Sequence, residues 1–320
     1  MEVLEGLHRI ETRLGNRKLF QHLFVGDRVI VIDTGVRETP ETDLFPYLET
    51  IGKRPSDIDL VIISHADADH FGGNETIRKA APAAWLAAHA FDVPWVSNPD
   101  RIVEERYNQF AKAHGIAYSP EVRQMLRDMM GGPVPIDLQL KGGETILLDE
   151  YRPLHILFLP GHTRGHIGVY DPVHKAAVLT DAILWRGLQD VQGQIVMPPT
   201  YCYTETYRAT IRFVESLDIH SLFLSHYAVI TGREDIGDFI AETQRFVDRT
   251  DAAILDVLRQ SHGWKTLEEM IDAVDPLVGP FGDARLELAY PLLGHLNEFV
   301  RQGRLEESAS DELTCWRFRG

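Results

Sequence analysis

The sequence contains few cysteines, few basic residues and no long apolar run, and each shortage excludes a class of protein. Two cysteines, Cys202 and Cys315, occur in 320 residues, too few and too far apart for a disulfide framework. The 32 Lys and Arg are outnumbered by 48 Asp and Glu, which gives a formal net charge of −16. Because phosphate binding requires clustered basic residues, this balance argues against a general nucleic-acid-binding protein.

No apolar run approaches the length that spans a bilayer, and the first residues, MEVLEGLHRIE, lack the apolar segment of a signal peptide. We therefore expect a cytoplasmic protein that does not enter a membrane. Hydrophobic residues make up 44% of the chain, which is ample for a core, and the length allows one large domain and a small one.

The most informative stretch is IDLVIISHADADHFGGN, residues 58–74. Its unbroken apolar run, Leu60 to Ile63, is typical of a strand buried on both faces. Close behind it, a short segment spaced by alanines offers four side chains that can bind a metal: His65, Asp67, Asp69 and His70. The alternative is a solvated loop rich in Asp and His, but the strand-end position and the small spacers favour a metal site.

The spacing of these four side chains indicates two metal ions. Side chains two residues apart in an extended segment point the same way, so His65 and Asp67 can reach one metal. The turn that follows directs Asp69 and His70 toward a second metal. Imidazole and carboxylate ligands suit zinc, iron or manganese.

The stretch HADADHFGG resembles the HxHxDH signature of the metallo-β-lactamase superfamily, with Asp67 in place of the middle histidine. Three further segments resemble later motifs of that family, in the family's order: PGHTRGH at 160–166, the strand-end Asp181, and SHY at 225–227. Each follows an apolar, strand-like run, and the match covers roughly residues 7 to 230. The resemblance implies an α+β fold, the four-layer αβ/βα sandwich.

The resemblance also implies the ligands of two divalent metal ions, zinc foremost, with iron or manganese as alternatives. The first set is His65, Asp67, His162 and Asp181, and the second set is Asp69, His70, His226 and Asp181. Two neighbouring residues are expected to serve other roles. Asp33, in a DTG turn, should be a structural hydrogen-bonding residue, and His166 should pack beside the ligands.

A dinuclear centre of this kind implies a hydrolase. Two metals that share Asp181 can hold a water between them and lower its pKa toward neutrality. The resulting hydroxide would attack an ester, lactone, thioester or phosphoester of a small molecule, with Asp69 and Asp181 as catalytic carboxylates. Counting Asp67 as a third carboxylate brings the hydroxide-bound site near neutrality, which shifts the first metal toward iron or manganese.

Two other functions compete with a small-molecule hydrolase. The HxDxDH pattern resembles the motif of competence-type DNA-uptake proteins, which suggests a nuclease, but the acidic composition disfavours it. Flavodiiron oxygen and nitric oxide reductases carry a glutamate where Asp67 stands, which suggests a non-haem diiron oxidoreductase. Such reductases need a flavodoxin-like domain, and the C-terminal segment is too short to be one. We therefore expect a small-molecule substrate and no nucleic acid.

Three residues near the motifs are candidate substrate contacts. Arg164, between His162 and His166, would meet an anionic substrate group or form a surface ion pair. Trp185 and Tyr227 are aromatic residues close to the implied cleft, where they would either line a pocket or simply pack.

Periodicity and turn signals predict the remaining elements of the main part of the chain. Three strands are expected before the motif, at 7–14, 18–25 and 28–33. A helix at 204–217 should precede the strand that leads to His226, and a helix over 236–247 should close the first domain.

The predicted division is a catalytic domain at 1–250, with a helical insertion at about 91–135, and a smaller domain at 251–320. The insertion contains two helical patterns, 102–114 and 119–131, which would cover the site, contact a second copy or pack on the core. In the smaller domain three helical segments precede a hairpin, at 252–260, 266–273 and 285–302. This order resembles the winged-helix domain of some metallo-β-lactamase hydrolases. Its acidic character disfavours DNA binding, so we expect a cap or dimerisation element, and a homodimer.

Overall fold

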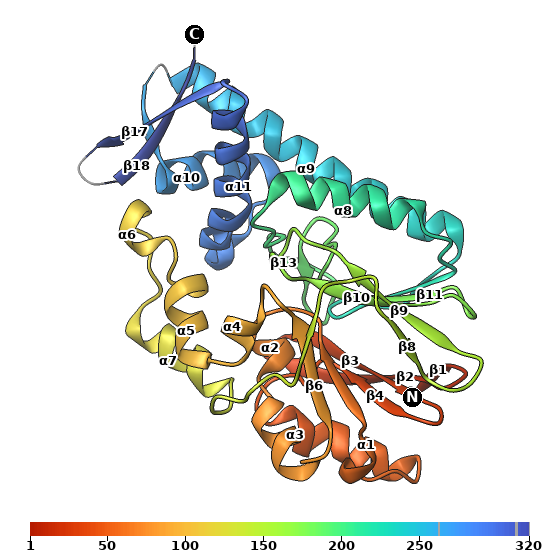
Figure 1. Cartoon of the computed structure of the whole chain (residues 1–320). Helices are drawn as coiled ribbons and strands as arrows, with labels where there is room; N and C mark the ends of the chain where they lie inside the picture. The colour runs from red at the N-terminus through yellow and green to blue at the C-terminus, as the bar shows by residue number, and fades with distance from the viewer. Residues whose placement is uncertain (262, 311–312, 320) are drawn as a thin grey trace.

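The computed structural model describes residues 1–261, 263–310 and 313–319, and two β-sheets packed face to face form its centre (Figure 1). The first sheet has seven strands in chain order: β1 (Glu2–Leu4), β2 (Leu7–Leu14), β3 (Arg17–Val25), β4 (Val29–Ile32), β5 (Leu60–Ile63), β6 (Trp85–His89) and β7 (Leu138–Leu140). The second sheet has six strands, in the order β15 (Ile230–Thr231), β14 (Ser221–Leu224), β11 (Ala176–Thr180), β10 (Ile167–Asp171), β9 (Pro153–Phe158) and β8 (Thr145–Leu147).

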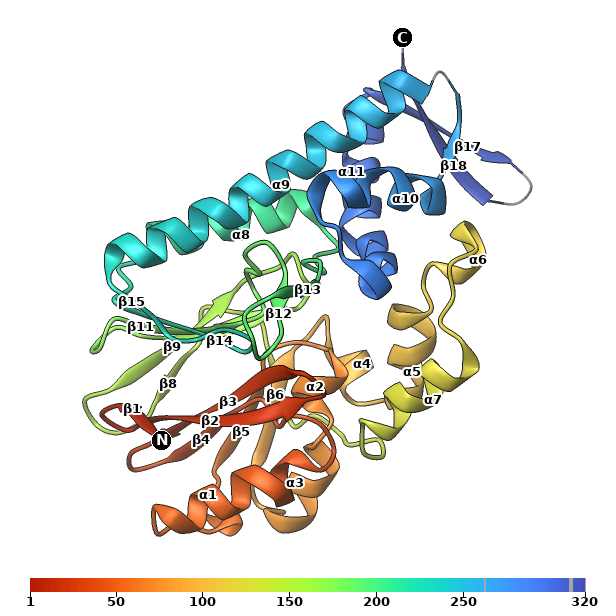
Figure 2. The ribbon, with the colours of Figure 1, turned by 180° about the vertical axis from the view of Figure 1, so that it is seen from behind.

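Helices cover the outer side of each sheet. α1 (Phe45–Thr50) and α3 (Asn74–Ala80) lie on the first sheet, and α8 (Thr204–Ser216) and α9 (Arg233–Ser261) lie on the second (Figures 1 and 2). The predicted four-layer αβ/βα sandwich is therefore confirmed. Within the described ranges, no helix is both long and apolar enough to cross a bilayer.

The apolar run of the motif strand is buried on both faces, as predicted. Leu60 and Ile62 of β5 pack in the core between the sheets, whereas Val61 and Ile63 pack in the core beneath the outer helices. This division follows from the two-residue period of a strand, which sends successive side chains to opposite faces. A strand with both faces covered carries no polar residue until it ends, which places the first polar side chains at the edge of the sheet.

The insertion is a series of short helices, and the predicted continuous helix over 102–114 is wrong. It consists of α4 (Val93–Val96), α5 (Pro99–Ile102), a π-helical turn η3 (Val103–Tyr107), α6 (Ala111–His114) and α7 (Pro120–Asp128). The wide turn of η3 coincides with two consecutive side chains, Arg106 and Tyr107, that both bind Asp67. The next helix is as predicted, and Ser119 Oγ caps it by accepting from Val122 N at 3.3 Å.

Helix α9 is a single helix of 29 residues, so the predicted break between residues 247 and 252 is wrong. The junction contains no Gly or Pro, and the buried face continues through Val247, Thr250 and Ile254. The predicted domain boundary at 250/251 falls inside this helix. The division of the chain into a catalytic and a smaller domain therefore stays a prediction.

The C-terminal region lies against the insertion. It contains α10 (Leu267–Val278), the 3₁₀ helix η4 (Gly282–Leu288), α11 (Ala289–Arg301) and a separate three-stranded sheet of β16 (Lys265–Thr266), β18 (Leu313–Phe318) and β17 (Leu305–Ser310). The predicted hairpin is present as β17 and β18, and residues 311–312 at its tip lie outside the described ranges. Aromatic contacts join the two regions, since Phe110 meets Tyr290 at 4.9 Å and His114 stacks on Trp316 at 5.5 Å between ring centroids.

His295 connects α11 to α9 through a buried hydrogen-bond chain, and we expect it to make stability depend on pH. Its Nδ1 donates to Asp251 Oδ1 at 2.6 Å, and its Nε2 accepts from the Tyr201 hydroxyl at 2.7 Å. Burial lowers the pKa of His295 below its ordinary value, although Asp251 opposes this shift. The unfolded chain therefore takes up this proton first, at about pH 6.5, and stability falls as the pH falls through that value.

The test of this pH dependence compares the parent with His295→Gln, whose side chain can also donate and accept but does not titrate. Between pH 7.5 and 5.5 the parent should lose about 1 kcal/mol more of its free energy of unfolding than the variant. Urea unfolding at the two pH values measures both slopes. Equal slopes for the two proteins would show that His295 does not titrate in this way.

Candidate metal centre

The seven side chains proposed as metal ligands meet where several strands end. The segment HADADH follows β5, His162 follows β9, Asp181 follows β11 directly, and His226 follows β14. Their ligand atoms form three overlapping groups, each with all atoms within 4.8 Å of one another: His65, Asp67 and His162; His65, His70 and Asp181; Asp69, His70 and His226. The groups share His65 and His70, so they form one continuous centre.

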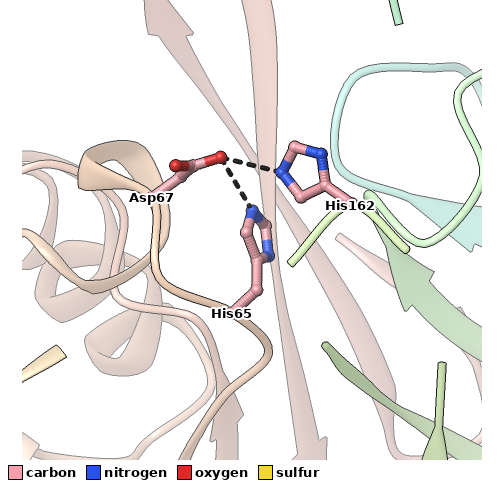
Figure 3. A group of neighbouring side chains, drawn as sticks. All are labelled: His65, Asp67 and His162. Carbon is pink, nitrogen blue, oxygen red and sulfur yellow. Dashed lines mark hydrogen bonds and ion pairs between the residues drawn. The ribbon is translucent and has the colours of Figure 1, made fainter. Parts of the chain in front are cut away.

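The first group is shown in Figure 3, where one oxygen of Asp67 faces two imidazoles. Asp67 Oδ2 is 2.8 Å from His162 Nε2 and 3.5 Å from His65 Nε2. The other side of the centre has a similar arrangement around one oxygen of Asp181. Asp181 Oδ2 lies 3.2 Å from His226 Nε2 and 3.5 Å from His70 Nε2.

Asp69 belongs to the third group, with His70 and His226. Its Oδ2 is 3.6 Å from His226 Nε2, and its Oδ1 is 3.9 Å from His70 Nε2. Asp181 belongs to a group with His65 as well as lying beside His70 and His226. Asp181 therefore lies close to members of all three groups.

The donor set fits divalent metal ions. Among the proposed ligands, His65 Nε2, His70 Nε2 and Asp181 Oδ1 are buried atoms without a hydrogen-bond partner in the described residues. Burial alone would lower the pKa of His70, but Asp33, Asp69 and Asp181 raise it well above its ordinary value. These three carboxylates thus stabilise a positive charge at the His70 imidazole. A metal ion supplies that charge when it binds the ring in place of a proton.

Hydrogen bonds on the outer nitrogens orient three of the histidines. Asp33 accepts from His70 Nδ1 at 2.7 Å and also from both the backbone N and the hydroxyl of Ser64, each at 2.7 Å. His65 Nδ1 donates to Ser64 Oγ at 2.9 Å, and His226 Nδ1 donates to Lys18 O at 3.0 Å. Each bond leaves Nε2 facing the centre. The prediction that Asp33 is a structural hydrogen-bonding residue is confirmed.

His166 packs beside the centre, as predicted. Its ring stacks on His65 with centroids 4.7 Å apart, and its Nε2 lies 3.1 Å from Thr180 Oγ1. His166 belongs to none of the three ligand groups. Its buried ring therefore supports His65 from behind.

Asp92 joins two of the ligand loops, and the sequence analysis missed it. Its carboxylate accepts from Ala66 N at 3.0 Å in one loop, and from Thr163 Oγ1 at 2.6 Å and Gly165 N at 2.9 Å in the other. A Cβ on Gly165 would lie 2.6 Å from Asp92 Oδ1, so this approach requires glycine. The one signal in the sequence was an acidic residue shortly after a strand, which is a common arrangement.

Arg106 is the second residue that the sequence analysis missed. Its Nε donates to Asp67 Oδ1 at 2.7 Å, its Nη2 donates to Asp67 Oδ2 at 2.9 Å, and the residue is 3% exposed. Burial would raise the pKa of Asp67, but Arg106 and then His162 hold it well below its ordinary value. The sequence analysis expected a near-neutral centre because it counted the carboxylates and the metals alone. The Arg106 guanidinium adds a positive charge beside Asp67, so that expectation is wrong.

None of the three predicted substrate contacts lines the cavity over the centre, and their contact with a substrate stays a prediction. Arg164 is exposed and lies over the ring of Tyr203 at 5.1 Å. Trp185 stacks on Phe239. Tyr227 is buried, and its hydroxyl lies 2.7 and 2.9 Å from the carbonyls of Leu184 and Gly187. Packing and backbone hydrogen bonds therefore account for these side chains.

A cavity of about 450 Å³ opens over the candidate metal centre. Its floor contains Asp67, Asp69, His162, Asp181 and His226. One wall is the apolar face of α7, formed by Val122, Met125, Leu126 and Met129. The opposite side includes Arg17 and Leu188, and the C-terminal region contributes Glu287 and Tyr290. The insertion and the C-terminal region thus both take part in covering the centre.

The chain belongs to the metallo-beta-lactamase superfamily. The family model described by that name matches residues 22–226, which is more than half of the chain. Among solved structures, a metallo-beta-lactamase family protein from Thermus thermophilus aligns with a TM-score of 0.73 at 19% identity, covering 99% of this chain and 100% of that one. A beta-lactamase domain protein from Burkholderia ambifaria aligns with a TM-score of 0.69 at 15% identity, covering 100% of this chain and 94% of that one.

Two relatives with described activities are also similar in sequence. The probable metallo-hydrolase YflN of Bacillus subtilis (strain 168) is 22% identical over 250 residues, which cover 72% of this chain and 88% of the relative. The acyl-coenzyme A thioesterase MBLAC2 of Gallus gallus is 26% identical over 181 residues, which cover 53% of this chain and 58% of the relative. Family membership and the three ligand groups both indicate a metal-binding site in this chain.

Proposed function

We propose that this protein is a dinuclear metal-dependent hydrolase that acts on small acyl thioesters or esters. The observation that carries the proposal is the convergence of seven ligand side chains, five of which line the floor of a cavity with an apolar wall. His65, Asp67 and His162 would hold one metal, Asp69, His70 and His226 the other, and Asp181 would contact both. When bound, the two metals supply Lewis-acid activation of a carbonyl and of a water.

The residues of the chain supply orientation and a partly dry environment. Asp33, Ser64 and the carbonyl of Lys18 fix the histidine rings, so that little reorganisation is needed during the reaction. His162, Asp181 and His226 of the floor are buried, which strengthens the electrostatic interactions among them. The proposed catalytic carboxylates, Asp69 and Asp181, both line this floor.

The walls of the cavity favour an apolar acyl group over a phosphodiester. Met125, Leu126 and Met129 offer an apolar surface next to the polar floor. On the far side Tyr118 donates to the carboxylate of Glu287. The pKa of Glu287 is raised, mainly by burial. In the described part of the cavity, no cluster of basic residues that could bind a phosphate lines the wall. The relative described as an acyl-coenzyme A thioesterase supports the choice of a thioester.

The proposed function is tested with metal-depleted protein reloaded separately with zinc, iron(II) or manganese. The substrates are acyl thioesters of two to eight carbons, matched oxygen esters, lactones and a phosphodiester. We expect about two metals per chain and metal-dependent thioester or ester hydrolysis, with loss of activity in Asp69→Asn. A faster reaction with the phosphodiester, or full thioester hydrolysis by metal-free protein, contradicts the proposal.

The apolar wall leads to a prediction about substrate length. Met125 is 53% exposed and lines the cavity, so Met125→Trp adds bulk there without disturbing the core. For an eight-carbon thioester, kcat/KM should fall about 10-fold or more, whereas for an acetyl thioester it should change little. Steady-state kinetics with both substrates measures the ratio. Leu277→Phe, at an exposed site on α10, is the control, and an equal loss for both substrates in Met125→Trp counts against the assigned wall.

Three expectations from the sequence stay predictions. These are a homodimer, a cytoplasmic location, and a winged-helix-like C-terminal region that acts as a cap or in dimerisation. We propose the cap role because Glu287 and Tyr290 of this region line the cavity. Sedimentation of the purified protein measures the oligomeric state directly.

A further inference from the structure

Arg106 contacts the centre from a part of the chain that carries none of its motifs. It lies in η3 of the insertion and is almost fully buried. Two of its nitrogens bind the two oxygens of Asp67 in a bidentate pair. Such a pair fixes the relative orientation of guanidinium and carboxylate more tightly than a single contact does.

The two oxygens of Asp67 have different surroundings. Oδ1 accepts from Arg106 Nε and from the Tyr107 hydroxyl, the latter at 3.2 Å. Tyr107 is itself held by Ala68 N, which donates to its hydroxyl at 2.7 Å. Oδ2 faces the imidazoles of His65 and His162 (Figure 3). Arg106, which also donates from Nη2 to Oδ2, therefore fixes the plane of the Asp67 carboxylate, and Tyr107 holds Oδ1 on the side away from the imidazoles.

The charges of Asp67 and Arg106 cancel. A histidine ligand is neutral, whereas an aspartate ligand brings a negative charge into a buried centre. The adjacent guanidinium brings a positive charge, so the Asp67–Arg106 pair is neutral, as an imidazole is. Either member left alone would be a buried, unpaired charge, which is strongly unfavourable.

We propose that Arg106 is a positioning residue of the first metal site, and that Asp67 and Arg106 act together as a neutral unit in place of a histidine. This inference rests on the proposed dinuclear centre. It leads to an expectation for Asp67→His. The substitution restores the HxHxDH motif but leaves Arg106 without its carboxylate beside the imidazoles, so the site is not restored.

The test is a double-mutant cycle on metal-depleted protein, with zinc affinity measured by competition with a chromophoric chelator. The proteins are the parent, Asp67→His, Arg106→Met and the double variant. Methionine removes the charge and keeps an unbranched apolar side chain. We expect Asp67→His to bind its first-site zinc about 10-fold or more weakly than the parent. Adding Arg106→Met should recover about 10-fold or more of that loss.

A second buried pair provides the matched control. Arg152 donates from Nε to Asp171 Oδ2 at 2.8 Å and is also buried. It precedes β9, whereas His162 follows the other end of that strand. Arg152→Met in the Asp67→His background removes a buried guanidinium of the same kind away from the centre. This variant should recover no zinc affinity.

The cycle has clear opposing outcomes. The inference is overturned if the double variant binds zinc no more tightly than Asp67→His, or if Asp67→His alone binds as tightly as the parent. Should Asp67→His fail to fold, Asp67→Asn with and without Arg106→Met gives the same comparison, with the same order of affinities expected. A parent that holds fewer than two metals contradicts the proposed function, whereas two metals without recovery contradict only the role of Arg106.

Discussion

Asp181→Asn is expected to lower the metal content to one ion or fewer per chain and to reduce kcat/KM by about 100- to 1000-fold. Asparagine keeps the shape of the side chain and removes its charge. Asp181 Oδ2 lies within 3.5 Å of the Nε2 atoms of both His70 and His226. Burial alone would raise the pKa of Asp181, but these two imidazoles hold it well below its ordinary value. The loss of one shared anion therefore weakens both sites together.

Asp171→Asn is the matched control for this substitution. Asp171 is a fully buried aspartate of the same sheet, at the end of β10, and it pairs with Arg152. The control should lose stability, seen as a lower Tm, and keep its full metal content. Elemental analysis of both variants separates the two effects. An Asp181→Asn protein that still holds two metals would show that Asp181 is not shared between the sites.

Asp33→Asn is expected to weaken metal binding at the site of His70 by about 10- to 100-fold, although Asp33 belongs to none of the three ligand groups. Its carboxylate accepts from His70 Nδ1 and from Ser64, and these bonds fix two ring orientations. Its φ of 63° is left-handed, a conformation that asparagine adopts readily, so backbone strain is not added. The measured loss then reports the charge and the hydrogen bonds.

The control for Asp33→Asn lies near the opposite ends of the same two strands. Asp59, just before β5, accepts from Val29 N at the start of β4 at 2.8 Å. Asp59→Asn should leave metal affinity within about 2-fold of the parent, because it orients no ligand. Chelator competition on metal-depleted proteins measures both. Equal affinities in Asp33→Asn and Asp59→Asn would show that Asp33 does not orient the centre.

The fold and the ligand cluster were readable from the sequence because both depend on local patterns. The run Leu60 to Ile63 identifies a strand covered on both faces, and each proposed ligand lies shortly after the end of a strand. Since strand ends collect at one edge of a sheet, side chains distant in the sequence meet there without any further information. His162, Asp181 and His226 are brought to the centre in this way.

The residues that support the ligands were not readable, because their position depends on irregular backbone. Arg106 reaches Asp67 across 39 residues from a π-helical turn, and Asp92 reaches Thr163 across 71 residues. Arginine and aspartate are common at such positions, so their types alone carried no signal. For Arg164, closeness to a ligand in the sequence does not mean a position in the cavity. Arg164 is two residues from His162, yet the turn between them directs it to the surface.

The cavity is assembled from separate stretches of chain, and this has a consequence for how its selectivity can change. The floor belongs to the part that matches the family, whereas Glu287 and Tyr290 lie more than 60 residues beyond His226. Diversification of positions 282–290 would therefore alter which substrates fit without replacing a proposed ligand. A directed-evolution library confined to those positions can search for new substrates while every proposed metal ligand is kept.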